Sequence, residues 1–222
     1  HISVPSSFVK RTFVEKGVPA SKLLKMPLGV DLSEFRPLPK RDAVFRVVFA
    51  GRLELQKGVH YLLQAFSELQ LQDAELWLIG SRSREMTPFL DRYDGYYTHI
   101  DHVPQPQLRQ YYSQCSVLVL PSVHDGFGMV LAQAMACGLP VICTENTAGD
   151  DLVTNGVEGF VIPIRDVCAL KDKLLHLYEN PETCKEMGKA ALGRVAAGLS
   201  WDDYGDRMCQ QYSRILREQG RL

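Results

Sequence analysis

Residues 117–140 read VLVLPSVHDGFGMVLAQAMACGLP, and this stretch decides how the chain folds. It begins with an apolar, strand-like run at 117–120 and continues into a turn that carries Asp125, Gly126 and Gly128. An apolar helical segment follows, and the chain then enters another strand. Strand, helix and strand in this order predict a right-handed βαβ unit with parallel strands.

The same alternation of strands and helices extends from residue 44 onward. Several strands are continuous apolar runs, which is typical of strands buried on both faces of a sheet. We therefore predict an α/β fold, a Rossmann-like doubly wound parallel sheet of about six strands with helices on both faces. The expected strands lie at 44–50, 74–79, 97–103, 117–120, 140–143 and 159–162. The expected helices lie at 57–69, 84–93, 107–114, 128–137, 149–153, 167–178 and 181–196, and a last helix begins near 200.

The first residues do not fit this sheet. They indicate an amphipathic helix at 8–16, a short strand and a proline-rich connector. We predict three parts: a remnant of an N-terminal domain with its connector at 1–43, a ligand-binding domain at 44–198 and a C-terminal helix at 199–222. The chain opens at His1 with neither methionine nor signal peptide, so we expect a fragment of a longer protein.

The composition, 45% hydrophobic and 23% charged over 222 residues, is that of an ordinary globular protein. A net charge of −1 disfavours nucleic acid as a partner. Residues 1–60 carry eleven Lys/Arg against five Asp/Glu, which leaves open an anionic ligand, a membrane surface or a solvated face. Six cysteines without zinc spacing indicate a reducing, cytoplasmic setting, and Cys115, Cys137 and Cys143, which have apolar neighbours, are expected to pack as small hydrophobic groups.

Two polar side chains mark the helix that follows the glycine turn. The N–H groups at the start of a helix attract anions, and a phosphate is their usual ligand. Gln133 follows Asp125 by eight residues, which is about 12 Å along a helix with a rotation of about 80°. A ligand that contacts both is long, with room for phosphates between its ends, and a nucleotide-sugar has that shape.

The turn after the first strand of the sheet contains two cations. Arg52 and Lys57 follow a buried strand, where parallel sheets bind ligands. A guanidinium and an ammonium can neutralise a departing diphosphate without a metal. The alternative is that both are solvated loop residues.

The sequence lacks the motifs of several other nucleotide sites. The dinucleotide fingerprint fails because its third glycine falls at Leu131. There is no P-loop, and no D-x-D pair that could hold a metal-bound nucleotide-sugar. We therefore expect neither a metal nor a cofactor. A dinucleotide oxidoreductase of doubly wound fold stays open as a disfavoured alternative.

Motifs along nearly the whole chain carry a family resemblance. They are Pro27-Leu28-Gly29-Val30-Asp31, Phe35 and Pro37, Gly51-Arg52, Lys57-Gly58, Pro121-Ser122, Gly126-Phe127-Gly128 and Ala134-Met135-Ala136-Cys137-Gly138-Leu139-Pro140-Val141. The chain resembles the C-terminal, donor-binding domain of retaining glycosyltransferases with the GT-B fold. That large family, glycosyl transferases group 1, includes bacterial glycan-assembly enzymes and sucrose-phosphate synthases.

The resemblance implies roles for individual residues. Arg52 and Lys57 match the pair that holds the donor diphosphate, and Asp125 and Gln133 occupy the two ends of the family's E-x7-E signature. In that signature the first acid contacts the donor sugar and the second binds the ribose. The further donor-binding residues that it implies lie in the turns after the strands and at the start of the helix: Gly51, Gly80, His102, Val103, Gly126, Phe127, Gly128, Met129 and Val130.

Both signature acids differ in this sequence. Asp125 is one methylene shorter than glutamate, and Gln133 has lost the charge but can still accept a hydrogen bond from a ribose hydroxyl. We expect transfer of a sugar from a nucleoside-diphosphate-sugar to an acceptor hydroxyl with retention of configuration, catalysed with the help of Arg52, Lys57 and Asp125. The acceptor glycan, lipid or small molecule would bind the missing domain, so the fragment alone is expected to bind donor without turnover. A non-catalytic nucleotide-binding module is the alternative, and peripheral contact with the inner face of a membrane stays open.

Overall fold

The computed structural model describes residues 1–218 and residue 220. Its strands are β1 (Ile2–Val4), β2 (Leu23–Lys25), β3 (Phe45–Ala50), β4 (Ala74–Ile79), β5 (Thr98–Ile100), β6 (Val117–Leu120), β7 (Val141–Thr144) and β8 (Gly159–Ile162). Its α-helices are α1 (Ser7–Glu15), α2 (Val59–Leu69), α3 (Thr87–Arg92), α4 (Leu108–Tyr112), α5 (Met129–Ala136), α6 (Gly149–Leu152), α7 (Val167–Glu179), α8 (Pro181–Ala196) and α9 (Trp201–Glu218). Short 3₁₀ turns are η1 (Ala20–Lys22), η2 (Leu55–Lys57), η3 (Arg84–Met86) and η4 (Gln105–Gln107).

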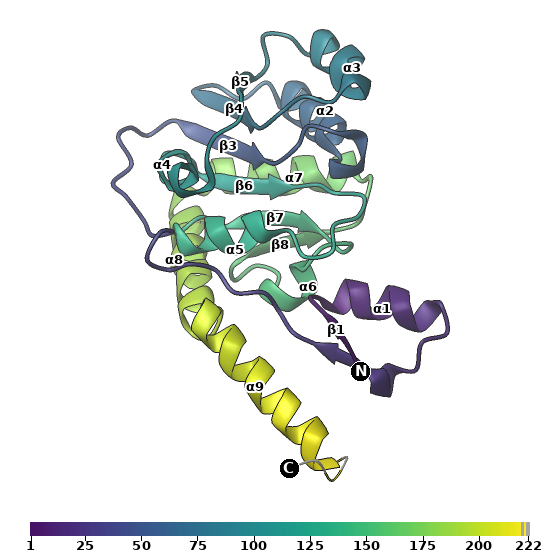
Figure 1. Cartoon of the computed structure of the whole chain (residues 1–222). Coiled ribbons are helices and arrows are strands. Elements are labelled where there is room, and N and C mark those ends of the chain that lie inside the picture. The colour runs from purple at the N-terminus through teal and green to yellow at the C-terminus, as the bar shows by residue number, and fades with distance from the viewer. Residues whose placement is uncertain (219, 221–222) are drawn as a thin grey trace.

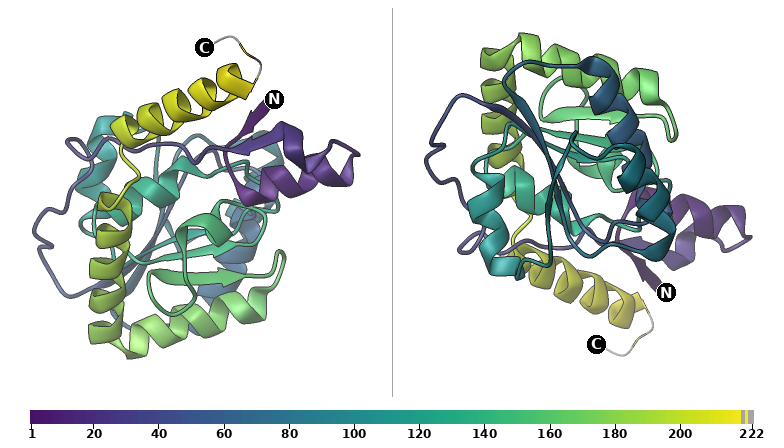
Figure 2. Two further views of the ribbon diagram at one scale, coloured as in Figure 1. Left: turned by 90° about the horizontal axis from the view of Figure 1, so that it is seen from below. Right: turned by 90° about the horizontal axis from the view of Figure 1, so that it is seen from above.

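Six parallel strands form the main sheet in the order β5-β4-β3-β6-β7-β8. The chain builds outward from β3 in one direction, crosses back, and builds outward from β6 in the other. Helices α4 and α5 lie on one face of the sheet, and α2 and α7 lie on the other (Figures 1 and 2). The predicted doubly wound α/β fold is confirmed, and its switch point lies between β3 and β6.

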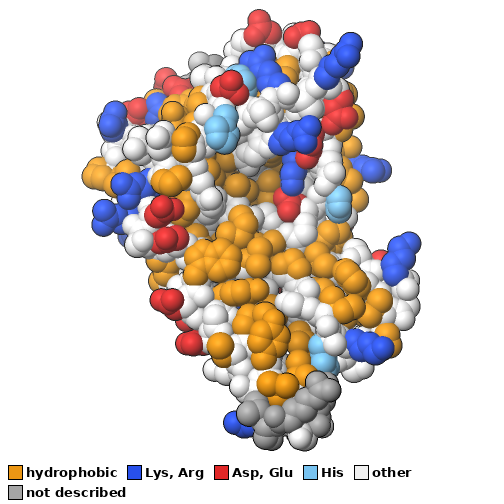
Figure 3. Space-filling model, in the orientation of Figure 1, with side chains coloured by type: hydrophobic (Ala, Val, Ile, Leu, Met, Phe, Trp, Pro, Cys, Tyr) orange, Lys and Arg blue, Asp and Glu red, His pale blue; other side chains and the backbone are white. Residues whose placement is uncertain are grey.

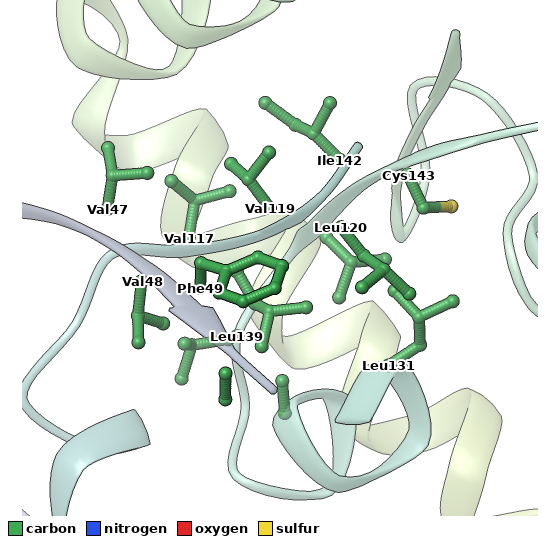
Figure 4. Packing of buried hydrophobic residues seen from close by; sticks show 14 of the residues in the cluster. Val47, Val48, Phe49, Val117, Val119, Leu120, Leu131, Leu139, Ile142 and Cys143 are labelled. Carbon is green, nitrogen blue, oxygen red and sulfur yellow. The ribbon is translucent and has the colours of Figure 1, made fainter. Parts of the chain in front are cut away.

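The apolar runs form the core, as the sequence predicts. All residues of β3, β6 and β7 are buried. Figure 4 shows side chains of these strands packed with Leu131 of α5 and Leu139 into one cluster. Three of the cysteines, Cys115, Cys137 and Cys143, are buried here, and burial raises the pKa of each thiol to about 12. They therefore stay neutral and pack as small hydrophobic groups.

Several expected elements are shorter in the structure. The strand expected at 97–103 is only β5, because the Asp101 carboxylate accepts the His102 N–H at 2.8 Å and Pro104 follows. The helix expected at 57–69 is interrupted at Gly58, which adopts a left-handed conformation between η2 and α2. Part of the helix expected at 84–93 is the 3₁₀ turn η3, and the helix expected at 107–114 is only α4.

Residues 1–25 form a βαβ unit of their own, which we call the N-terminal unit. Its strands β1 and β2 pair in parallel in a separate two-stranded sheet, with α1 between them. The helix and the second strand were expected, but β1 was not. The unit packs beside α6 at the carboxyl ends of the large sheet's strands (Figure 1).

Helix α9 leaves the sheet and extends along the lower part of the molecule (Figure 1). It is amphipathic, and its residues are all exposed or partly exposed within the described range. Figure 3 shows apolar side chains gathered across the middle of this face and continuing into its lower half. Among residues 1–218 and 220, no helix is both long enough and apolar enough to cross a membrane.

Candidate functional site

A pocket of about 350 Å³ lies at the switch point, where the turns that follow β3 and β6 meet. The N-terminal unit and the connector close its remaining side with Pro5 and Leu28. The full lining is Pro5, Leu28, Ala50, Gly51, Lys57, Leu120, Asp125, Gly126, Phe127, Gly128, Met129 and Val130. Most of the residues expected at the glycine turn therefore surround one cavity.

Gly58 brings Lys57 to this pocket. Its φ of 67° is left-handed, and a Cβ at this position would overlap the carbonyl oxygen of Pro121. The N–H of Val123 also donates to the carbonyl oxygen of Gln56 at 2.9 Å, so the turns after β3 and β6 are packed together. Lys57, at the end of η2, is thereby placed against the glycine turn.

Lys57 and Asp125 form an ion pair inside the pocket. Lys57 Nζ lies 2.6 Å from Asp125 Oδ2, and the two side chains are 21% and 19% exposed. Asp125 Oδ1 accepts the N–H groups of Phe127 at 3.3 Å and of Gly128 at 3.0 Å. The Asp125 carboxylate therefore holds both the backbone of the turn and the Lys57 ammonium in place.

The beginning of α5 supplies the next two donors. Gly128 adopts a φ of 72°, and a Cβ there would lie 2.6 Å from Leu120 Cδ2. The first N–H groups of α5, those of Met129 and Val130, donate to no acceptor among the residues that the structure describes. Both residues line the pocket. Free N–H groups at a helix start beside an ammonium form an anion-binding arrangement.

Arg52 lies at the rim of the site in the free chain. Its side chain is 67% exposed, with Nε 3.6 Å from a carboxylate oxygen of Glu54. It faces a neighbouring hollow between the turns after β3 and β4, which Ser83, Arg84 and Glu85 also line. Reaching the pocket that Lys57 lines requires a rotation of this exposed side chain.

The residues expected at the nucleobase end lie outside the pocket lining. Gly80 follows β4, and His102 is exposed and Val103 half-buried after β5. The side chain beside Gly80 is instead that of His99, whose Nε2 lies 2.8 Å from the Gly80 carbonyl oxygen. His99 was missed because it lies inside the expected strand 97–103, whereas His102 and Val103 lie at its carboxyl end.

Gln133 lies on α5, one helical turn after Met129, and is not among the residues that line the pocket. It is 2% exposed on α5, and its Oε1 has no hydrogen-bond partner within the described residues. A buried acceptor without a partner is costly, so the position calls for an explanation. The structure therefore joins Lys57, Asp125 and the glycine turn in one pocket but leaves Gln133 outside its lining.

The N-terminal unit and the connector contribute residues that were not among the expected site residues. Pro5 and Leu28 line the pocket from a part of the chain predicted to belong to another domain. Leu28 stands in a motif quoted for the family resemblance, which was the available signal. The residue after Pro5, Ser6, is fully buried and donates a hydrogen bond to the Gly126 carbonyl oxygen.

Comparison with known proteins bears on this site. Residues 44–180 match the family described as "Glycosyl transferases group 1". The chain is 30% identical over 194 residues to D-inositol 3-phosphate glycosyltransferase of Arthrobacter sp. (strain FB24), covering 79% of the chain and 46% of that relative. It thus spans about half the length of the curated relatives it matches.

Solved structures share the fold. Sucrose-phosphate synthase from Thermosynechococcus elongatus superposes with a TM-score of 0.84 at 26% identity, over 97% of this chain and 58% of that one. Anabaena HepE, solved in complex with UDP and glucose, superposes with a TM-score of 0.81 at 18% identity, over 96% of this chain and 62% of that one. At that identity the likeness to HepE concerns the fold.

Proposed function

The chain belongs to the glycosyl transferases group 1 family, and from this premise we propose that it is the donor-binding half of a retaining glycosyltransferase. Its ligand is a nucleoside-diphosphate-sugar, held in the pocket at the switch point. The observation that carries the proposal is the Lys57 ammonium, fixed by Asp125 beside the free N–H groups at the start of α5. The UDP and glucose in HepE, which shares the fold, support this ligand class.

The charges suit a diphosphate leaving group. When the bond between the sugar C1 and the diphosphate oxygen breaks, negative charge grows on the phosphate. Lys57, the N–H groups of Met129 and Val130, and Arg52 after rotation can stabilise that charge. The acceptor hydroxyl forms the new bond to C1 on the face that the phosphate leaves, and its proton passes to a phosphate oxygen. Configuration at C1 is retained, and no metal or cofactor takes part.

Asp125 has a double role in this proposal. Its Oδ1 holds the turn, while Oδ2 faces Lys57 and keeps lone-pair capacity for a hydroxyl of the donor sugar. Gln133 is outside the pocket lining, and its Oε1, which has no hydrogen-bond partner among the described residues, is suited to accept a hydrogen bond from a ribose hydroxyl of the nucleotide. Gly80, His102 and Val103 would flank the base.

The acceptor site belongs to the half of the relatives that this chain does not match. On this proposal the other half completes the cleft, so the chain alone binds donor and shows little or no transfer. The acceptor, a glycan, a lipid or a small molecule, binds the other half, and any peripheral membrane contact is made by the longer protein. The domain division at residues 43 and 198 belongs to the same proposal.

A second candidate is a non-catalytic nucleotide-binding module. It is favoured by one observation: Asp125 is engaged by three donors and Gln133 is buried, so neither side chain projects freely toward a sugar.

Saturation-transfer NMR separates the two candidates. The chain is mixed with UDP-glucose, GDP-mannose or ADP-glucose, and transfer to the ligand protons is recorded. We expect signals on both the nucleoside and the sugar protons of one compound, because the sugar sits beside Asp125. Signals on the nucleoside alone would favour the binding module, and no signal with any compound would contradict both candidates.

A further inference from the structure

A buried hydroxyl of the N-terminal unit forms a hydrogen bond to the glycine turn. Ser6 is 0% exposed, and its Oγ donates to the Gly126 carbonyl oxygen at 2.6 Å. The Ser6 Oγ also accepts a hydrogen bond from the N–H of Val9 at 3.1 Å, so Ser6 caps α1 as well. One side chain therefore joins the start of α1 to a turn 120 residues away.

This bond fixes the direction of an N–H group in the site. The carbonyl of Gly126 and the N–H of Phe127 belong to one planar peptide unit and point in opposite directions. When Ser6 holds the carbonyl, the N–H is aimed at Asp125 Oδ1, which it reaches at 3.3 Å. The other oxygen of that carboxylate holds Lys57. Ser6 is thus linked to the Lys57 ammonium through one peptide and one carboxylate.

A second set of contacts keeps Ser6 in place. The side chain of Asp151 in α6 is 3% exposed and accepts the Ser7 N–H and the Ser7 hydroxyl, each at 2.6 Å. The Lys25 ammonium of β2 lies 2.5 Å from the same carboxylate. Asp151 therefore anchors both α1 and β2 to the large domain, which holds the Ser6 hydroxyl over Gly126.

Packing at the turn restricts it further. The Val9 side chain lies 3.6 Å from where a Cβ on Gly126 would be, and the Phe8 ring packs edge-on to His124 with centroids 6.4 Å apart. On the opposite side, the N–H of Ala148 donates to the Phe127 carbonyl oxygen at 3.2 Å. The turn is held between α1 and the segment before α6.

We infer that Ser6 is a positioning residue of the donor site, acting through the Gly126–Phe127 peptide on Asp125 and Lys57. The inference rests on the proposed function for its ligand, a nucleoside diphosphate. Gly126 has no side chain to resist rotation of this peptide, so the Ser6 bond keeps the N–H of Phe127 on Asp125. A movement of the N-terminal unit would consequently change the position of the Lys57 ammonium, which binds the diphosphate.

The test compares Ser6→Ala and Ser6→Thr with a matched control. Asp166 caps α7 as Ser6 caps α1, accepting the Ala169 N–H at 2.8 Å, but it touches neither the turn nor the pocket. Asp166→Ala therefore reports what the loss of a helix cap does by itself. Calorimetry measures affinity for UDP, GDP and ADP, and amide hydrogen exchange follows the peptide that covers residues 125–130.

We expect Ser6→Ala to weaken binding of the nucleotide that the unaltered chain prefers by about fivefold to tenfold. Its exchange at 125–130 should rise by a similar factor, and Ser6→Thr should restore both because it keeps the hydroxyl. Asp166→Ala should leave both unchanged. Unaltered affinity in Ser6→Ala, no recovery in Ser6→Thr, or an equal loss in Asp166→Ala would overturn the inference.

Failure of the proposed function has a different signature. If the unaltered chain binds none of the three nucleotides, the donor-site proposal fails, and hydrogen exchange alone decides whether Ser6 orders the turn. Raised exchange in Ser6→Ala with recovery in Ser6→Thr would then still support the positioning of the turn, and unchanged exchange would overturn it.

Discussion

The Lys57 ammonium and the Asp125 carboxylate neutralise each other in the free pocket, so an entering phosphate competes with Asp125 for the same cation. At 2.6 Å and about one-fifth exposure, the pair is close but remains in contact with solvent. Ion pairs of this exposure contribute at most about 1 kcal/mol. A diphosphate, which also reaches the helix N–H groups, can therefore displace one carboxylate oxygen.

Asp125→Asn tests that competition. The amide oxygen can still accept the N–H groups of Phe127 and Gly128, while Lys57 loses the charge opposite it. We expect the affinity for a nucleoside diphosphate that carries no transferable sugar, such as UDP, to rise by about twofold to fivefold in calorimetry at low salt. Asp150→Asn, which removes a carboxylate 3.8 Å from Arg11 outside the pocket, is the control and should change nothing. A tenfold loss in Asp125→Asn would contradict the competition and mean that the carboxylate favours binding, by holding Lys57 or by contacting the nucleotide.

Gln133→Met tests why a buried amide is retained. Its Oε1 lacks a partner among the described residues, so an apolar side chain of similar size should raise the free energy of unfolding by about 1 kcal/mol. Nucleotide affinity should fall by about threefold to tenfold if the amide serves the ribose. Denaturant unfolding and calorimetry measure the two effects, with Gln64→Met on the surface of α2 as the control. Higher stability with unchanged affinity would make Gln133 a residue of the core only.

At the scale of elements, the site depends on how closely the turns after β3 and β6 approach each other. That approach is set by Gly58, which ends η2 and begins α2. The sequence predicts one helix through this point, because the apolar periodicity continues across it. The carbonyl of Pro121, which excludes a side chain at Gly58, is more than sixty residues away, so the local sequence pattern could not predict this contact.

Gly58→Ala should cost about 3 kcal/mol of unfolding free energy, since it combines left-handed strain with overlap against Pro121. Gly156→Ala is the matched control, because Gly156 also has a positive φ, of 82°, but nothing within 4 Å of a Cβ. It should cost about 1 kcal/mol. Chemical denaturation measures both. Equal losses in the two variants would show that strain alone, and not the contact between the turns, governs this position.

The large sheet could be predicted because its strands are continuous apolar runs between turn residues, and this signal is local. The β5 strand was overestimated because it lies at an edge, where Asp101 ends pairing by bonding its neighbour's N–H. The meeting of Lys57 with Asp125 was partly predictable, since both follow strands whose carboxyl ends share one edge of the sheet. The Ser6 contact was not, because the N-terminal unit offered no sign of where it docks.

At the scale of the whole molecule, two parts of the chain build the pocket, the doubly wound domain and the N-terminal unit. The doubly wound domain supplies the cation and the helix start, and the N-terminal unit supplies Pro5 and the Ser6 hydroxyl. The chain spans about half the length of the relatives it matches. Experiments on this chain can therefore test the wall of the site that holds the donor, which is formed by the pocket around Lys57 and Asp125. We propose that Lys57 binds the diphosphate at this wall.

Calorimetric titration with UDP, GDP and ADP, of the unaltered chain and of Lys57→Ala, tests that claim most directly. Lys171→Ala is the control, since it removes a comparable ion pair, 2.8 Å from Glu68, away from the pocket. We predict that one nucleotide binds the unaltered chain and Lys171→Ala equally, and binds Lys57→Ala at least about tenfold more weakly. Binding that survives in Lys57→Ala, or no binding of any of the three nucleotides to the unaltered chain, would contradict the account.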